Sequence, residues 1–193
     1  MAGRRPLVDS IIRTTLEGHA KAVQSVSWSP DSEHVASGSV DSTIKIWRAK
    51  TGSLVRTIEG HTGAVNSVLW SRDGLRVVSG SGDGSVKMWN SETGMLERTL
   101  EGHTEDVVAV AWSIDGQFLL SGSFDRSAII WSAEGALVHT LKGHETWSNG
   151  PPEKDGGHTQ AVRTVAWSPS GHLVASGSQD TTTKLWNTET GAC

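Results

Sequence analysis

A histidine, a serine and an aspartate lie near one another in the sequence around residue 120, and these residue types can act together in catalysis. His103 belongs to a Gly-His pair, and Ser121 and Asp125 lie in the segment SGSFDRSAIIW that follows it. The same residue types form the catalytic triad of many hydrolases, in which the serine is the nucleophile. Trp131 at the end of the segment is suited to the wall of a substrate pocket. Residue types alone therefore suggest a hydrolytic site.

The same set of residues, however, occurs four times at constant spacing. Nine residues after each histidine comes a tryptophan, and nineteen residues further comes a second one, which is preceded six residues earlier by an aspartate. Each aspartate follows a Ser-Gly-Ser triplet. The four sets are His19, Ser37, Asp41 and Trp47; His61, Ser79, Asp83 and Trp89; His103, Ser121, Asp125 and Trp131; and His158, Ser176, Asp180 and Trp186. An enzyme needs one such constellation in a cleft, so four copies favour a structural role.

The elements between these residues are predicted to be short β-strands. In the second repeat, AVNSVLW, LRVVSGS, SVKMW and MLERTL are separated by the turn segments SRDG, GDG and SETG. Asp-Gly between β-branched runs is a strong hairpin signal, because glycine accepts the positive φ that such turns need. No segment shows the 3.6-residue apolar period of a helix. Four antiparallel strands in each unit of about 40–45 residues describe one propeller blade.

The repeats resemble those of the WD40 family, whose units carry a Gly-His near the start and a Trp-Asp near the end. The residue after the second tryptophan departs from that pattern, being Arg48, Asn90, Ser132 or Asn187. The resemblance implies an all-β, WD40-type β-propeller in which each His, Ser, Asp and Trp set forms a buried hydrogen-bonded chain inside its blade. We expect a tail at residues 1–9 and blades over 10–193, with repeats at about 16–57, 58–99, 100–140 and 141–193.

Four blades are few for a closed ring, because propellers of this family mostly have seven. Residues 10–17, SIIRTTLE, align with the fourth-strand segments SLVRTIE and MLERTLE, and the last repeat stops at TETGAC, before a fourth strand of its own. The N-terminal residues could thus supply the strand that the last blade lacks. We expect either an open arc, as a fragment of a longer propeller, or half of an eight-bladed ring of two chains. A strained ring of four blades is the less favoured alternative.

Composition and charge argue against several classes of function. A formal net charge of −4 and a pI of about 6.0 argue against a nucleic-acid or membrane surface built on basic residues. The single cysteine, Cys193, closes no internal disulfide, which favours an intracellular protein of the cytoplasm or nucleus. Structural histidines 42 residues apart lie in different blades, too far from one another to share a zinc ion, so we expect neither a metal nor another cofactor.

Recognition is expected where the repeats differ. Residues 145–158, ETWSNGPPEKDGGH, are an insertion with turn-forming Asn-Gly and Pro-Pro pairs, and they contain Trp147, which is the one tryptophan outside the repeat pattern. They form either a binding loop or a tolerated surface loop. Other contact positions implied by the family are Gln24, Val40, Asn66, Asp106, Val108, Phe124, Arg163 and Gln179. Phe124 is either an exposed anchor beside Val108 and Val40 or partly buried on its own turn.

The function expected from these features is a non-catalytic scaffold that binds a protein or peptide on one propeller face. An alternative is a recognition module split or truncated from a larger multidomain signalling protein, such as an ATPase or a kinase. An enzyme that uses the central channel is a third possibility. A second copy of the chain is a further candidate partner, as a homodimer that completes the ring.

Overall fold

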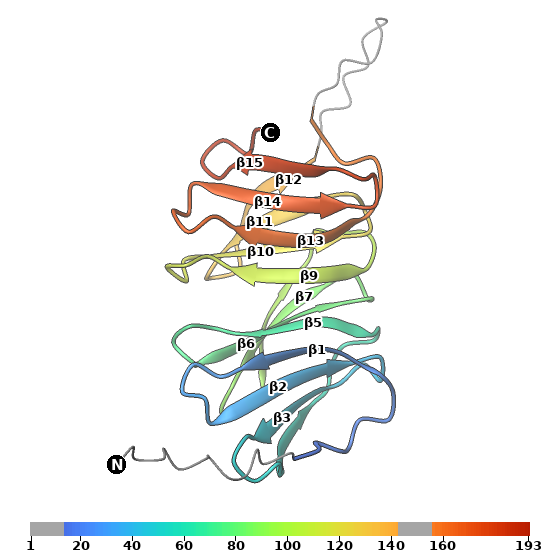
Figure 1. The fold of residues 1–193 in the computed structure, drawn as a ribbon, viewed down its shortest axis with the longest axis vertical. Helices are drawn as coiled ribbons and strands as arrows, with labels where there is room; N and C mark the ends of the chain where they lie inside the picture. Colours follow the sequence, from blue (N-terminus) through green and yellow to red (C-terminus); the bar gives the residue numbers. More distant parts are fainter. Residues whose placement is uncertain (1–13, 143–155) are drawn as a thin grey trace, which may run out of the picture.

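The protein is built from short antiparallel strands, as a computed structural model shows (Figure 1). The structure describes residues 14–142 and 156–193, and its elements there are all strands. Among these residues no helix is long and apolar enough to cross a membrane. The strands are β1 (Val23–Trp28), β2 (His34–Ser39), β3 (Ile44–Arg48), β4 (Leu54–Ile58), β5 (Val65–Trp70), β6 (Arg76–Ser81), β7 (Val86–Asn90), β8 (Leu96–Leu100), β9 (Val107–Trp112), β10 (Phe118–Ser123), β11 (Ala128–Ser132), β12 (Leu137–Leu141), β13 (Val162–Trp167), β14 (Leu173–Ser178) and β15 (Thr183–Asn187).

The strands form four sheets in chain order, each a meander of antiparallel neighbours. Their orders are β1-β2-β3-β4, β5-β6-β7-β8, β9-β10-β11-β12 and β13-β14-β15. The first strand of each sheet contacts the first strand of the next, so β1, β5, β9 and β13 line the inner side of the stack. Figure 1 shows the four sheets following one another along the longest axis, with the first and the fourth at opposite ends. We call these sheets blades 1 to 4.

The apolar core lies between consecutive blades. One cluster joins Met88 and Leu100 of blade 2 to Val107 and Trp131 of blade 3, and the other two clusters join blades 1 and 2 and blades 3 and 4 in the same way. Close approach requires glycine on the second strand. A Cβ at Gly80 would lie 2.7 Å from a methyl group of Val107. Each blade therefore depends on its neighbour to bury its apolar face.

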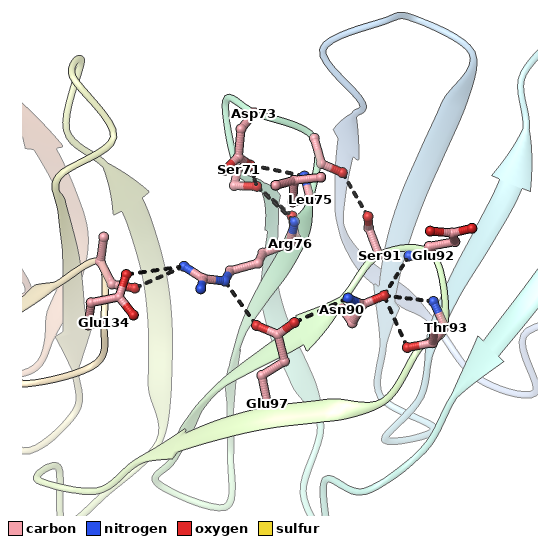
Figure 2. A network of polar contacts seen from close by, with 12 residues as sticks. Ser71, Asp73, Leu75, Arg76, Asn90, Ser91, Glu92, Thr93, Glu97 and Glu134 are labelled. Atoms are coloured by element: carbon pink, nitrogen blue, oxygen red, sulfur yellow. Dashed lines mark hydrogen bonds and ion pairs between the residues drawn. The ribbon is translucent and has the colours of Figure 1, made fainter.

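A polar contact also joins blades 2 and 3 at their surface. The guanidinium of Arg76 on β6 donates to Glu97 on β8 over 2.9 Å and to the carbonyl of Ala133 in blade 3 over 3.2 Å, with Glu134 close by (Figure 2). The Arg76 side chain is 30% exposed. Because exposed ion pairs of this kind stabilise a protein by about 1 kcal/mol or less, the apolar contacts dominate the junction.

The two ends of the stack do not meet, so the four blades form an open arc. Val26 on β1 is 66% exposed and Leu185 on β15 is 58% exposed, whereas Val68 and Met88 at the same repeat positions of blade 2 are buried. The prediction of an all-β, open WD40-type propeller is confirmed, and a strained four-bladed ring is not what the chain forms. Blade 4 has three strands rather than four among the described residues.

The packing between blades can be tested by truncating one valine. Val107→Ala removes two buried methyl groups that fill the space above Gly80, so the free energy of unfolding should fall by about 2 kcal/mol. Val55→Ala is the matched control, because Val55 is 42% exposed on an outer strand. Urea unfolding followed by tryptophan fluorescence measures both variants. Equal losses of stability would contradict a core located between the blades.

Candidate functional site

Each blade brings its histidine, serine, aspartate and second tryptophan into one hydrogen-bonded chain. In blade 3, Nδ1 of His103 lies 2.9 Å from Asp125, Nε2 of His103 lies 2.8 Å from the hydroxyl of Ser121, and the indole N–H of Trp131 donates to that hydroxyl over 2.8 Å. The corresponding distances in the other three blades lie between 2.7 and 2.9 Å. All four predicted sets are thus assembled with the same geometry.

The direction of each hydrogen bond follows from the chemistry of its partners. An indole N–H only donates, so the oxygen of Ser121 accepts from Trp131, and we assign its own proton to the hydrogen bond with Nε2 of His103. Nε2 therefore accepts, and Nδ1–H donates to the carboxylate of Asp125. The same assignment in the other three sets also places the histidine proton on Nδ1.

This connectivity is that of a hydrolase triad, but the serine is not accessible. In a triad the serine also donates to Nε2 of the histidine, while the aspartate holds the Nδ1–H. Ser121 has no exposed surface, and its oxygen is occupied by the indole of Trp131. A substrate carbonyl therefore has no path to this oxygen. The chain satisfies polar groups that would otherwise be buried without partners.

A hydroxyl residue two positions after each aspartate completes the arrangement. In blade 2, Oδ1 of Asp83 accepts from the amide of Ser85 over 2.9 Å and from its hydroxyl over 2.6 Å, while Oδ2 accepts from the amide of Thr62 over 3.0 Å. The residues at this position are Thr43, Ser85, Ser127 and Thr182. Sequence reasoning missed them, although a serine or threonine two residues after every aspartate was a readable signal.

The aspartate also holds a turn with unfavourable backbone geometry. The residue after it has a positive φ in every blade, of 69° at Ser42, 80° at Gly84, 71° at Arg126 and 71° at Thr181. Only glycine adopts this region without cost. At the other three positions the hydrogen bonds that the aspartate accepts on either side of the turn offset the strain.

These contacts shift the pKa of the groups in the chain. Burial on its own raises the pKa of the four aspartates, but hydrogen bonds from the hydroxyl residue, the histidine and backbone amides outweigh it and hold each pKa well below its ordinary value. Burial lowers the pKa of His61, because the charged imidazolium is poorly solvated, and the hydrogen bond to Asp83 opposes this only in part. Anionic aspartates and a neutral histidine fit the directions of the hydrogen bonds.

Some of the predicted partner-binding residues meet on the surface formed by the turns between the second and third strands of each blade. We call this surface the β2–β3 face, after the turn between β2 and β3 of blade 1 and the equivalent turns of the other three blades. The guanidinium of Arg163 in blade 4 lies 4.5 Å from the ring centre of Phe124 in blade 3. With its amide oxygen turned toward Arg163, Gln179 accepts from that guanidinium over 2.8 and 3.1 Å. Phe124 is half-buried, whereas Arg163 and Gln179 are exposed.

Backbone bonds attach these turns to the segments that precede the first strands. The amide of Phe124 donates to the carbonyl of Asp106, and the amide of Gln179 donates to that of Ala161, both over 3.0 Å. The carboxylate of Asp106 lies against Gly82 of blade 2, at the junction with blade 3. The β2–β3 face therefore displays charged side chains on a rigid base.

The remaining predicted contact residues do not join this group. Val40 and Gln24 belong to blade 1, and blade 2 lies between them and Phe124. Asn66 donates to the carbonyl of Val107 over 3.1 Å and so joins blades 2 and 3, while Val108 is half-buried. Trp147 and residues 145–155 of the insertion lie outside the described residues, and their predicted role stays a prediction.

The four meandering sheets and their repeated polar chains define a segment of a β-propeller. The WD40 family (WD domain, G-beta repeat) matches residues 10–48, 52–90, 94–132 and 153–187. The chain belongs to the WD40 repeat family and contains four of its repeats.

Similar proteins fall into two groups. A solved structure, that of the computationally designed Ika4 protein, has a TM-score of 0.73 and 32% identity over 90% of this chain and 95% of that one. Curated relatives match shorter stretches. The ribosome biogenesis protein BOP1 homolog of Drosophila virilis is 46% identical over 52 residues, which are 27% of this chain and 6% of that protein. Protein Mut11 of Chlamydomonas reinhardtii is 52% identical over 42 residues, which are 22% and 11%.

Removing one hydroxyl tests the structural role of the chain. Ser121→Ala leaves the indole N–H of Trp131 and Nε2 of His103 without a partner in a buried site, so the free energy of unfolding should fall by about 1–3 kcal/mol. Ser53→Ala removes a hydroxyl that is exposed and serves as the matched control. Denaturant unfolding of both variants gives the comparison. A Ser121→Ala variant as stable as Ser53→Ala would contradict the structural role.

Stability should fall with acid in two stages. The folded pKa of His61 is lowered, so the unfolded state binds more protons below about pH 6.5 and the free energy of unfolding decreases there. The folded pKa of each aspartate is also lowered, so a steeper loss is expected below about pH 4, as the unfolded chain takes up protons first. Urea unfolding from pH 3 to pH 8 measures both stages. A free energy of unfolding that stays constant or rises toward pH 4 would contradict these shifts.

Proposed function

We propose that the protein is a non-catalytic scaffold that binds a protein or peptide partner on its β2–β3 face. The observation that carries this proposal is the cluster of Phe124, Arg163 and Gln179. The cluster joins blades 3 and 4 through side chains whose types differ from those at the same repeat positions of the other blades. WD40 repeats as a family generally serve as interaction surfaces.

The chemistry of the cluster fits a partner that carries a carboxylate. A guanidinium stacked on an aromatic ring and held by an amide oxygen loses little side-chain freedom on binding, which lowers the entropic cost of association. Arg163 is exposed, so the remaining N–H donors of its planar guanidinium face solvent and match a carboxylate in geometry. Arginine and aromatic residues are also enriched among the residues that dominate binding energy.

The absence of catalysis is part of the proposal. The four triad-like sets are occupied by their own indole donors, and Ser121 and Ser79 have no exposed surface. No set differs from the others in a way that would open one of them to a substrate.

A second candidate is that the repeats are the recognition part of a longer protein, such as a signalling ATPase or kinase. The chain covers only 6% and 11% of the lengths of the two curated relatives described above. An effector domain encoded upstream of Met1 in the same gene would favour this candidate.

We also propose an intracellular setting, in the cytoplasm or nucleus, which is supported by the single cysteine and by a relative named for ribosome biogenesis.

Affinity capture from cell extract with defined variants tests the chosen surface. Arg163→Ala and Phe124→Ala should each lose partners that the unaltered protein retains, because the first removes the guanidinium and the second removes the ring that orients it. Trp147→Ala tests the insertion in the same way. Arg72→Ala, which alters an exposed arginine on the turn between β5 and β6, is the matched control and should retain all partners. Retention of every partner by all three variants would place recognition elsewhere.

A further inference from the structure

The face of blade 1 that points away from blade 2 carries apolar side chains that no other described residue covers. Its exposed side chains on β1 are Val23, Val26 and Trp28, with exposed fractions of 49, 66 and 61%. In blade 2 the first two repeat positions are Val65 and Val68, which are both completely buried against blade 1. β1 therefore presents to solvent the surface that every other blade buries against a preceding blade.

The opposite end of the arc exposes the matching half of a junction. Leu173 on β14 is 40% exposed and Leu185 on β15 is 58% exposed. Leu185 occupies the repeat position of Ile46, Met88 and Ile130, each at most 2% exposed because a following blade covers it. Exposed apolar surfaces of this kind mark association sites.

The two end faces complement each other residue by residue. At the interior junctions, Trp70 lies beside His34 and Trp167 stacks on Phe118 with ring centres 6.1 Å apart. The same two positions at the ends of the arc are Trp28 and Leu173. The glycine position that receives a valine of the next blade is Gly177 at the far end, and the matching valine is Val23.

A hydrogen bond between blades has its donor and acceptor at opposite ends as well. The amide of Val68 donates to the hydroxyl of Ser25 over 3.1 Å, and the amide of Val110 donates to that of Ser67 over 3.3 Å. At the ends of the arc this pair of positions consists of the amide of Val26 and the exposed hydroxyl residue Thr164.

Blade 4 has no fourth strand among the described residues, and a segment that could serve as one lies at the start of the described chain. A Cβ at Gly94 would meet Arg56 and Ile58 of the preceding outer strand, β4, and a Cβ at Gly52 would likewise meet Thr14 and Leu16. Residues 14–16 thus lie beside blade 1 where an outer strand of a preceding blade belongs. β15, at the other end, has no outer neighbour among the described residues.

The register of the other blades predicts which residues would pair. Lys45 on β3 pairs with Thr57 on β4, and Nζ of Lys45 donates to the hydroxyl of Thr57 over 2.8 Å. Lys87 and Thr99 of blade 2 repeat this contact over 3.0 Å. The corresponding residues at the open ends are Lys184 and Thr15, which have the same chemical types.

We propose that two copies of this chain associate head to tail into a closed ring of eight blades. In this ring β1 of each copy packs on blade 4 of the other. Residues 14–16 of each copy pair alongside β15 of the other copy and form the fourth strand of that blade. Two identical head-to-tail junctions related by a two-fold axis close the ring, and eight blades lie within the range that propellers adopt. The ring goes beyond the scaffold role and leaves both β2–β3 faces open.

The mass of the 193-residue chain in solution tests the ring. Light scattering after size exclusion should give twice the chain mass of 20.5 kDa at all concentrations above the dissociation constant. Val26→Asp and Leu185→Asp should each shift the mass to that of one chain while the far-ultraviolet circular dichroism stays unchanged. Leu75→Asp, at a residue that is 65% exposed outside the end faces, is the control and should remain a dimer.

A disulfide cross-link tests the register independently. Thr15→Cys and Lys184→Cys, combined with Cys193→Ser, place two thiols in directly opposed strand positions of different copies, which disulfide geometry permits. Mild oxidation should give a covalent dimer on a non-reducing gel, whereas pairing Thr15→Cys with Lys45→Cys should not. A monomeric mass, or an open series of oligomers that grows with concentration, would overturn the ring. So would dimers that persist in both aspartate variants.

Discussion

The structure depends on one buried hydroxyl in each blade. In blade 3 the hydroxyl of Ser121 accepts a hydrogen bond from the indole of Trp131 and donates one to the imidazole of His103. The imidazole in turn donates a hydrogen bond to Asp125. Through these bonds the second strand is tied to the third strand, to the segment before the first strand and to the turn that Asp125 holds. A blade is too thin to bury a core of its own, so this polar chain fixes the internal geometry on which packing between blades relies.

Packing between blades then determines the shape of the molecule. Valines of one blade fill the space above the glycines of the preceding blade, as Val107 does above Gly80. A stack built from such one-sided contacts has two unlike ends, one displaying β1 and the other β14 and β15. Propellers generally remove such ends by closing into a ring. In the open arc the ends remain, and apolar side chains such as Val26 and Leu185 are exposed to solvent. The β2–β3 face, where we propose that a partner binds, takes no part in this closure.

Much of this architecture could be predicted from the repeat alone. Constant offsets between histidines, aspartates and tryptophans indicated the blades, their strands and the polar sets, because residues at equal repeat positions occupy equivalent places. Thr43 and Ser85 were overlooked although their spacing from the aspartate was just as regular. The position of Arg163 over Phe124 could not be predicted, since it joins residues of different blades and depends on how the blades are stacked. Val40 was expected beside Phe124, yet blade 2 lies between them.

The protonation of the histidine rings tests the central claim most directly. Nitrogen-15 NMR of the imidazoles, combined with hydrogen exchange, distinguishes a proton on Nδ1 from one on Nε2 and measures its protection from solvent. His19, His61, His103 and His158 should each carry a slowly exchanging proton on Nδ1 and none on Nε2, because Nε2 accepts from a buried serine. Rings that carry the proton on Nε2, or that exchange the Nδ1 proton as rapidly as the solvent-exposed ring of His172, would contradict the account.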